Sequence, residues 1–330
     1  MESPSLNRRR FLAATSALGL SAAAGFASFQ PPKRKAQIAI TLDLEMSREY
    51  PRRDIREWDF EKGNLDQPTK DYAVEAGRIV REAGGVLHYF CVARVLEQRD
   101  VQWLQDLKTA GHPIGNHTYD HVNVLAKKPE ETQFRFQRSP WLVKGKSAEE
   151  IIRENIRLCT TAMEQRLGFK PDGFRTPGGF SNGLADRPDV QQLLVDCGFT
   201  WISGKYPAHA TGKPKEEPTD EVYASIVKAQ ADAQPFAYPS KLIEVPMSPI
   251  SDVGAFRTNY WKREWFLKAI GLGVDWAIRT GSTLDFLAHP SCLVVEDPEF
   301  ETIRMICRKV KEAGDRAEIV GLDKLATRVG

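Results

Sequence analysis

The residue types that could do chemistry gather in four short segments, each at the end of an apolar run. The first is Thr41-Leu42-Asp43-Leu44-Glu45, which follows the β-rich run 37–42. Because side chains alternate along a strand, Asp43 and Glu45 point to the same face. Two such carboxylates can share a metal ion, divide into a base and a ligand, or simply face solvent at a strand end.

The second segment, Asn116-His117-Thr118-Tyr119-Asp120-His121, places two histidines four residues apart. On a helical turn this spacing puts both imidazoles on one face, where they can reach one divalent ion. The pattern also arises by chance in helices. Its place directly after an expected strand at 112–116 favours a functional site.

The last two segments add an arginine and a histidine at further strand ends. Arg175-Thr176-Pro177-Gly178-Gly179 is typical of a rigid turn with exposed backbone N–H groups, which can hold an oxyanion. His289 follows the apolar strand expected at 283–288. It is either a proton donor at the mouth of the fold or a hydrogen-bonded core histidine.

The elements that must position these segments alternate between strands and helices. Apolar patterns predict strands at 37–42, 85–92, 112–116, 173–175, 199–203, 242–247, 283–288 and 318–320. Helices are expected at 69–83, 101–110, 147–167, 188–197, 262–279 and 298–313, with a short one at the end. Such alternation implies parallel β-α units, here an irregular (β/α)7-type barrel of the α/β class in a single domain. In a barrel, the loops after the strands build the active site.

Three connections are long for such a fold: 48–68, 122–146 and 205–241. The first two carry aromatic rings that could stack on sugar faces or form a small core under the loops. These rings are Tyr50, Trp58, Phe60, Phe134, Phe136 and Trp141. The third is rich in Lys, Pro, Glu and Asp, and we interpret it as a solvated surface excursion.

Composition and charge limit the class of protein. The 330 residues are 42% hydrophobic and 27% charged, which is ordinary globular usage. The net charge of +2 resides in the first 30 residues, so residues 31–330 carry 43 basic and 43 acidic groups. A balanced body excludes a nucleic-acid binder that relies on a basic surface. The five cysteines form no C-x-x-C pair and are most simply small core residues.

The N-terminus has the pattern of an export signal. Arg8-Arg9-Arg10-Phe11-Leu12 opens an uncharged run over 11–29, as in twin-arginine-type signals. The expected organisation is a signal peptide or uncleaved anchor at 1–30, a linker at 31–36 and a catalytic domain at 37–330. The mature protein is then expected in the periplasm, in the cell envelope or outside the cell. An uncleaved anchor would be its contact with the membrane.

The four segments, in this order, resemble the polysaccharide deacetylase family, the carbohydrate esterases with a NodB homology domain. His117-Thr118-Tyr119-Asp120-His121 matches the family's second motif. Arg175-Thr176-Pro177-Gly178-Gly179 matches the third motif, and Leu287-Ala288-His289-Pro290 matches the last. The resemblance spans about residues 37–325.

Two departures from the family pattern matter. The first motif is usually T-F-D-D-G, and Leu44 stands where its second Asp would be. Glu45 fits the D-x-E variant, in which the metal carboxylate comes one position later. The family's usual fourth motif is not recognisable, so Asp252 and Asp285 are both open as the carboxylate that orients His289.

The resemblance implies a metal-dependent hydrolase that removes N-acetyl or O-acetyl groups from a carbohydrate polymer. It assigns the metal to Glu45, His117 and His121, a ligand set that suits Zn²⁺ best and also accepts Co²⁺ or Mn²⁺. It further assigns Asp43 as general base, His289 as general acid, the Gly178 N–H as oxyanion donor and Arg175 as the residue that holds Asp43. An acetylated glycan is the implied partner.

Two other functions remain open. One is hydrolysis of small or cyclic non-peptide amides on the same scaffold. The other is an exported barrel that binds glycan without turnover. A disabled copy should have lost some of the expected catalytic and metal residues, and Asp43, His117, His121 and His289 are all retained.

Overall fold

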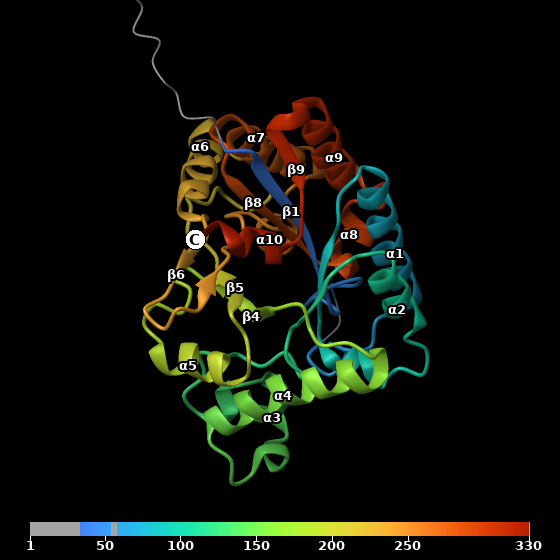
Figure 1. Ribbon diagram of the computed structural model, residues 1–330, viewed down its shortest axis with the longest axis vertical. Coiled ribbons are helices and arrows are strands. Elements are labelled where there is room, and N and C mark those ends of the chain that lie inside the picture. Colours follow the sequence, from blue (N-terminus) through green and yellow to red (C-terminus); the bar gives the residue numbers. More distant parts are fainter. Residues whose placement is uncertain (1–33, 54–57, 330) are drawn as a thin grey trace, which may run out of the picture. The chain divides into compact units, whose positions relative to one another are not determined.

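The computed structural model describes residues 34–53 and 58–329 (Figure 1). The expected signal peptide at 1–30 lies outside the described residues, as does the first half of the expected linker, residues 31–33. The described part of the linker ends inside a strand, because the first strand already begins at Ala36.

The described residues form one sheet of nine strands in the order β6-β7-β5-β4-β3-β2-β1-β8, with β9 also paired to β1. All neighbours are parallel except β6 and β7. The strands are β1 (Ala36–Leu44), β2 (His88–Cys91), β3 (Ile114–Asn116), β4 (Phe174–Phe180), β5 (Trp201–Lys205), β6 (Phe236–Ala237), β7 (Ile243–Glu244), β8 (Thr283–Ala288) and β9 (Ala317–Ile319). Every strand expected from the sequence is present, and β6 is additional.

The sheet curls into the expected irregular barrel, which closes without a regular strand pair. Residues after β7 run along β5, where the Val245 N–H donates to the Ile202 carbonyl at 2.8 Å. At the end of this segment the Ser248 N–H donates to the Asp285 carbonyl of β8 at 3.0 Å. One backbone hydrogen bond thus joins the two sides of the barrel where strand pairing has stopped.

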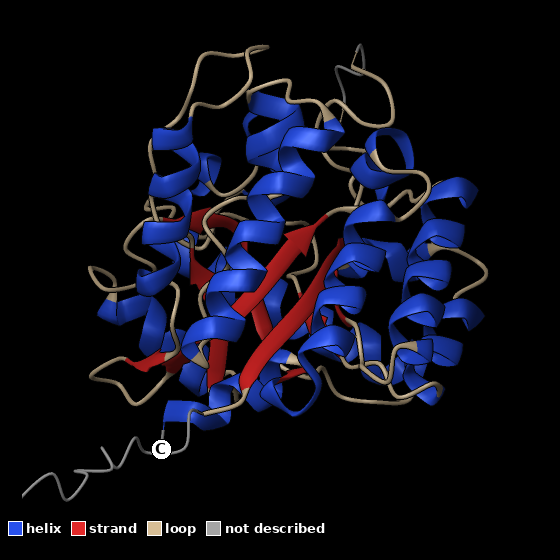
Figure 2. Ribbon diagram, turned by 90° about the horizontal axis from the view of Figure 1, so that it is seen from above, coloured by secondary structure: helices blue, strands red, loops and turns tan. Residues whose placement is uncertain are grey.

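Helices surround the strands (Figure 2). They are α1 (Gln67–Glu82), α2 (Gln102–Thr109), α3 (Phe134–Arg138), α4 (Ala148–Leu167), α5 (Pro188–Asp196), α6 (Asp220–Ala229), α7 (Arg263–Thr280), α8 (Pro290–Glu296), α9 (Glu301–Ala313) and α10 (Leu322–Ala326). Local sequence sets their ends: α4 starts with a capping box of Ser147 and Glu150 and stops at Gly168 in the left-handed conformation. The helices α3, α6 and α8 were not expected from the sequence.

The interpretation of 205–241 as a solvated surface excursion is wrong. Helix α6 lies within this connection and buries Val222, Tyr223 and Ile226 in the main hydrophobic core. The charged residues near its ends, Asp220, Glu221 and Lys228, are exposed, so the local composition is polar although one face of the helix is apolar.

The end of the barrel opposite the carboxyl ends of its strands is filled by side chains. Leu322 and Leu325 of α10 are buried in one cluster with Phe90 and Trp201. Gly173 lies directly against the Trp201 ring: a Cβ added there would come within 2.1 Å of a ring carbon. Close backbone approach at Gly173 therefore lets this large ring fit inside the barrel.

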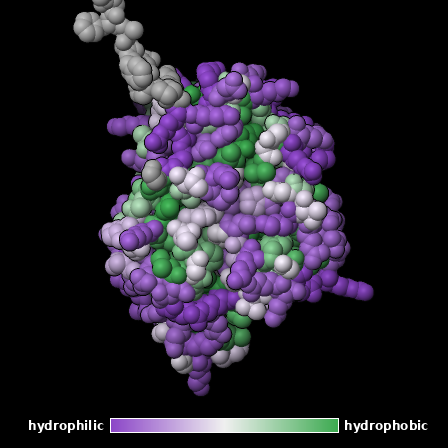
Figure 3. Space-filling view, viewed as in Figure 1, coloured by the Kyte–Doolittle hydropathy of each residue, from purple (hydrophilic) through white to green (hydrophobic). Residues whose placement is uncertain are grey.

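The cysteines were expected to be small core residues. Four of the five are buried and Cys197 is half-buried, and all five are free. In the described part of the chain, no helix is long and apolar enough to cross a membrane. The face drawn in Figure 3 is mostly hydrophilic, with scattered hydrophobic patches.

We predict that Gly173→Ala destabilises the fold more than Gly168→Ala. Both glycines have positive φ, 103° and 80°, so alanine costs about 1–2 kcal/mol of backbone strain at either site. Only Gly173 also meets a buried ring, and overpacking adds about 1–3 kcal/mol. Urea unfolding of the two variants measures the difference, and equal losses would contradict this packing at Trp201.

Candidate metal centre and active site

The residues singled out from the sequence converge at the carboxyl end of the barrel. Glu45 follows β1, His117 follows β3 and His289 follows β8, while Arg175 lies within β4. They meet around a pocket of about 490 Å³. Its walls include Asp43, Glu45, His117, His121, Gly178 and His289, and Arg175 is fully buried beside Asp43.

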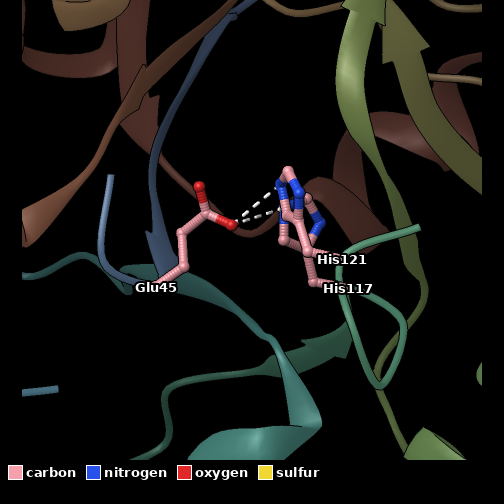
Figure 4. Close-up of side chains that lie close together, drawn as sticks. All are labelled: Glu45, His117 and His121. Atoms are coloured by element: carbon pink, nitrogen blue, oxygen red, sulfur yellow. Dashed lines mark ion pairs between the residues drawn. The ribbon is translucent and has the colours of Figure 1, made fainter. Parts of the chain in front are cut away.

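Glu45, His117 and His121 form a compact cluster (Figure 4). One ligand atom from each lies within 4.8 Å of the other two. Glu45 Oε2 is 2.8 Å from His121 Nε2 and 3.8 Å from His117 Nε2. One carboxylate oxygen thus faces two imidazole nitrogens, an oxygen and nitrogen set that suits Zn²⁺ or a related divalent ion.

Hydrogen bonding leaves the ligand atoms of this cluster available. His117 Nδ1 lies 3.0 Å from the Arg175 carbonyl oxygen. A carbonyl can only accept, so Nδ1 carries the proton and Nε2 keeps its lone pair. Among the described residues, His117 Nε2 is buried without a hydrogen-bond partner, and Glu45 Oε2 lies against His121 Nε2, the third atom of the cluster. A backbone carbonyl that fixes the outer nitrogen is a common support for metal-binding histidines.

The charge states also fit a cation. Burial holds the pKa of His117 well below its usual value and also lowers the pKa of His121. Burial raises the pKa of Glu45, but His121, Lys62 and His289 together lower it by more, so the net pKa lies well below normal. Neutral imidazoles and an ionised carboxylate are the forms that bind a metal. The residues present therefore fit a divalent metal ion.

The expected helical turn at 117–121 does not form, so this part of the sequence interpretation is wrong. Thr118 and His121 have φ values of 60° and 57°, in the left-handed region. Asparagine side chains hold the loop instead: Asn116 Oδ1 accepts from the Thr118 N–H at 2.8 Å, and Asn155 Oδ1 accepts from the Asp120 N–H at 2.8 Å. The two histidines meet through this loop geometry.

Arg175 links the site to the barrel interior. Its guanidinium donates to Asp43 Oδ1 at 3.3 Å and to Asp285 Oδ2 at 2.5 Å. The shorter hydrogen bond thus goes to Asp285 rather than to Asp43. Burial raises the pKa of Asp43 to about 6, although Arg175 and His289 act to lower it. Asp43 is therefore poised to exchange a proton near neutral pH.

Asp252 is the carboxylate that orients His289. Its Oδ2 accepts from the His289 backbone N–H at 2.8 Å, and its Oδ1 lies 3.1 Å from His289 Nδ1. Asp285, the other candidate, pairs with Arg175 and accepts from the Thr41 hydroxyl. Burial lowers the pKa of His289, but Asp252, Glu45 and Asp43 together raise it by more, and the net direction is upward.

Gly178 also lines the pocket, in an irregular part of β4. The pairing of β4 with β5 shifts register between Arg175 and Phe180, so the residues between them leave the regular ladder. Gly178 has a φ of 85°, which favours glycine, and its carbonyl accepts from the Thr176 hydroxyl at 2.7 Å.

Lys62 is a site residue that sequence reasoning missed. Its ammonium group is buried and forms an ion pair with Glu45 Oε1. This contact occupies one carboxylate oxygen and leaves Oε2 facing the histidines. Lys62 belongs to the long connection after β1 and to no motif, so its sequence position carried no signal of this role.

Residues 60–200 match the family model described as polysaccharide deacetylase. The match identifies a polysaccharide deacetylase domain in this part of the chain. It includes His117, His121, Arg175 and Gly178, whereas Glu45 and His289 lie outside the matched residues. None of the curated proteins compared with the chain matches it.

Solved structures show the same fold. A Mycobacterium smegmatis protein assigned as a polysaccharide deacetylase has a TM-score of 0.59 at 16% identity, with 91% of each chain covered. The Puue allantoinase has a TM-score of 0.61 at 13% identity, covering 90% of this chain and 91% of its own. A Pseudomonas aeruginosa PAO1 protein assigned as a polysaccharide deacetylase reaches 0.60 at 13% identity, with 90% and 91% covered. These likenesses confirm the expected barrel.

We predict that Lys62→Met strongly destabilises the metal-free protein. Removal of one partner of a buried ion pair leaves Glu45 uncompensated and costs about 3–5 kcal/mol. Combining it with Glu45→Gln should recover at least about 1 kcal/mol of that loss. Urea unfolding in the presence of a chelator supplies this double-mutant cycle, with exposed Lys213→Met as the control. Additive losses would show that the two side chains are not coupled.

A second prediction concerns Asp252→Asn. Without the carboxylate, burial dominates, so the pKa of His289 should fall by about 1–3 on the pH scale. NMR titration of the imidazole in metal-free protein measures this pKa, and the His289→Gln variant assigns the signal. Asp275→Asn, which removes an exposed carboxylate on α7, should leave the titration unchanged. An unchanged midpoint in Asp252→Asn would contradict the orienting role.

Proposed function

We propose that the chain is a metal-dependent hydrolase that removes acetyl groups from carbohydrate. The observation that carries this proposal is one pocket that holds Glu45, His117 and His121 together with Asp43 and His289. The domain match over residues 60–200 supports the carbohydrate substrate. In this proposal Glu45, His117 and His121 would hold the divalent ion, which would supply Lewis-acid polarisation of the acyl oxygen and of water.

Asp43 is the proposed general base. Its carboxylate lies in the pocket, with Oδ2 3.6 Å from His117 Nε2, and therefore beside the metal ligands. With a pKa of about 6, Asp43 is mostly ionised at pH 7 and can accept the proton of an attacking water. Arg175 fixes its other oxygen, so the carboxylate does not need to reorganise during the reaction.

His289 is the proposed general acid. Asp252 holds Nδ1, which leaves Nε2 directed to the pocket, 3.5 Å from Glu45 Oε1. The upward direction of its pKa favours the protonated form that a leaving amine requires. Proton transfer of this kind contributes about 10²–10⁴ in rate.

The backbone N–H of Gly178 is the proposed oxyanion donor. Glycine at this position leaves the backbone uncovered, because a Cβ added there would meet no atom within 4 Å. One such donor is worth about 3 kcal/mol in the transition state.

Four of the six aromatic rings in the long connections divide into two groups, while Phe60 is half-buried and Trp141 is exposed, and neither lines the pocket. Tyr50 and Phe136 are buried and belong to the core, as one of the two sequence interpretations expects. Trp58 and Phe134 line the pocket, with ring centroids 5.4 Å apart in an edge-on pair. We propose that these two rings contact the sugar, which agrees with the other interpretation.

We propose that the protein is exported by its twin-arginine-type N-terminus and meets its substrate outside the cytoplasm. This rests on the sequence of residues 1–30 alone. Replacing Arg8 and Arg9 with Lys should retain the protein in the cytoplasm, as measured by cell fractionation.

We predict that Glu45→Ala and Asp43→Asn separate metal binding from turnover. Glu45→Ala removes a proposed ligand and should lose the metal, whereas Asp43→Asn should keep it and lose at least about 100-fold in kcat. Elemental analysis measures the metal. Acetate release from N-acetylglucosamine oligomers, peptidoglycan and acetylated xylan measures deacetylation, and ring opening is measured separately for small cyclic amides. Full metal content in Glu45→Ala would contradict the ligand assignment, and no acetate from any glycan would contradict the function.

A further inference from the structure

The pocket wall carries basic side chains that do not pair with its own carboxylates. Of the charged side chains that line it, Asp43 and Glu45 are acidic, and Arg48, Lys62 and Arg257 are basic. Lys62 neutralises Glu45, and the buried Arg175 contacts Asp43. Two arginines on the wall therefore remain to be explained.

Arg257 is the more informative of the two. It lies in the π-helical segment Val253–Thr258, beside Asp252, and is partly buried. Within residues 34–53 and 58–329, no carboxylate forms an ion pair with it. Arg257 also acts to lower the pKa of the buried Lys62, so these two cations on the pocket wall repel each other. A partly buried guanidinium beside an ammonium is costly unless an anion completes the arrangement.

Arg48 reaches the same pocket from the connection after β1. Its described ion-pair partner is the adjacent Glu49, at 3.7 Å, and half of its side chain is exposed. Exposed pairs of this kind contribute about 0–1 kcal/mol, so the guanidinium remains available to another anion. It also lies 5.8 Å from the ring centroid of Trp58, one of the two proposed sugar-contacting rings.

We propose that Arg257 and Arg48 form a subsite for a carboxylate carried by the substrate, next to the reaction centre. The inference rests on the proposed function and narrows it to acyl compounds that bear an acidic group. The planar fork of a guanidinium matches a carboxylate in two parallel hydrogen bonds. The body of the chain is electrically balanced, so attraction for an anionic substrate is local to this pocket.

Binding is the direct test, because it does not require turnover. Two probes differ at one position: N-acetylmuramic acid carries a lactyl ether with a carboxylate on O3, where N-acetylglucosamine carries a free hydroxyl. Calorimetry with the metal-loaded protein should give at least about tenfold tighter binding of the acid, which is about 1.4 kcal/mol. The preference should weaken as salt is added.

Variants separate the arginines from the metal, which could itself attract a carboxylate. Arg257→Gln should lose about tenfold of the preference for the acid, and Arg257→Lys should keep part of it. Arg153→Gln is the control, because this arginine is also partly exposed but pairs with Glu149 on α4. Binding of N-acetylglucosamine and the metal content should stay unchanged in all three variants.

The outcomes distinguish this inference from the proposed function. If the wild type and Arg257→Gln prefer N-acetylmuramic acid over N-acetylglucosamine equally, the subsite is overturned, regardless of whether the protein releases acetate. An Arg257-dependent preference with no acetate released from any substrate would keep the subsite and reject the deacetylase. N-acetylglycine serves as a third probe: if it is bound and hydrolysed better than the sugar acid, the carboxylate belongs to a small acyl amino acid rather than to a glycan.

Discussion

The buried guanidinium of Arg175 is the contact on which the rest of the site depends. From β4 it donates to Thr41 at 2.8 Å, to Ser203 at 3.2 Å and to Asp285 at 2.5 Å, and so joins β1, β5 and β8 across the barrel interior. Its own carbonyl accepts from His117. Because a buried charge must be paired, this network fixes which strands face one another and where the first histidine lies.

The same low-polarity surroundings set the chemistry above this network. Burial raises the pKa of Asp43 and lowers the pKa of His117. Burial alone would therefore favour the neutral form of both side chains. Lys62 and His121 keep Glu45 ionised, and Asp252 raises the pKa of His289. One pocket thus holds an ionised ligand, neutral imidazoles and a protonatable acid within a few ångströms of one another. The charge states differ because each group has different charged neighbours within the same pocket.

The sequence allowed the barrel and most of the site to be predicted, because both depend on local patterns. Strand alternation placed Asp43 and Glu45 together, and the ends of parallel strands meet at one edge of any barrel. The turn at 117–121 was wrong because Asn155, a distant residue on α4, holds the loop in a non-helical path. Lys62 was missed and Asp252 was one of two open candidates, since each acquires its role from a contact with a residue outside its own segment. Helix α6 was missed because its few apolar residues lie within a long connection whose other residues are mostly polar.

The most direct measurement of the central claim is the position of the metal. Crystals of protein purified without chelator and supplied with Zn²⁺ can be examined by anomalous diffraction at the zinc edge. The strongest anomalous peak is expected between Glu45, His117 and His121, about 2.0–2.2 Å from one oxygen and two nitrogens. No peak there, or a peak bound by other residues, would contradict the metal centre on which the proposed reaction rests.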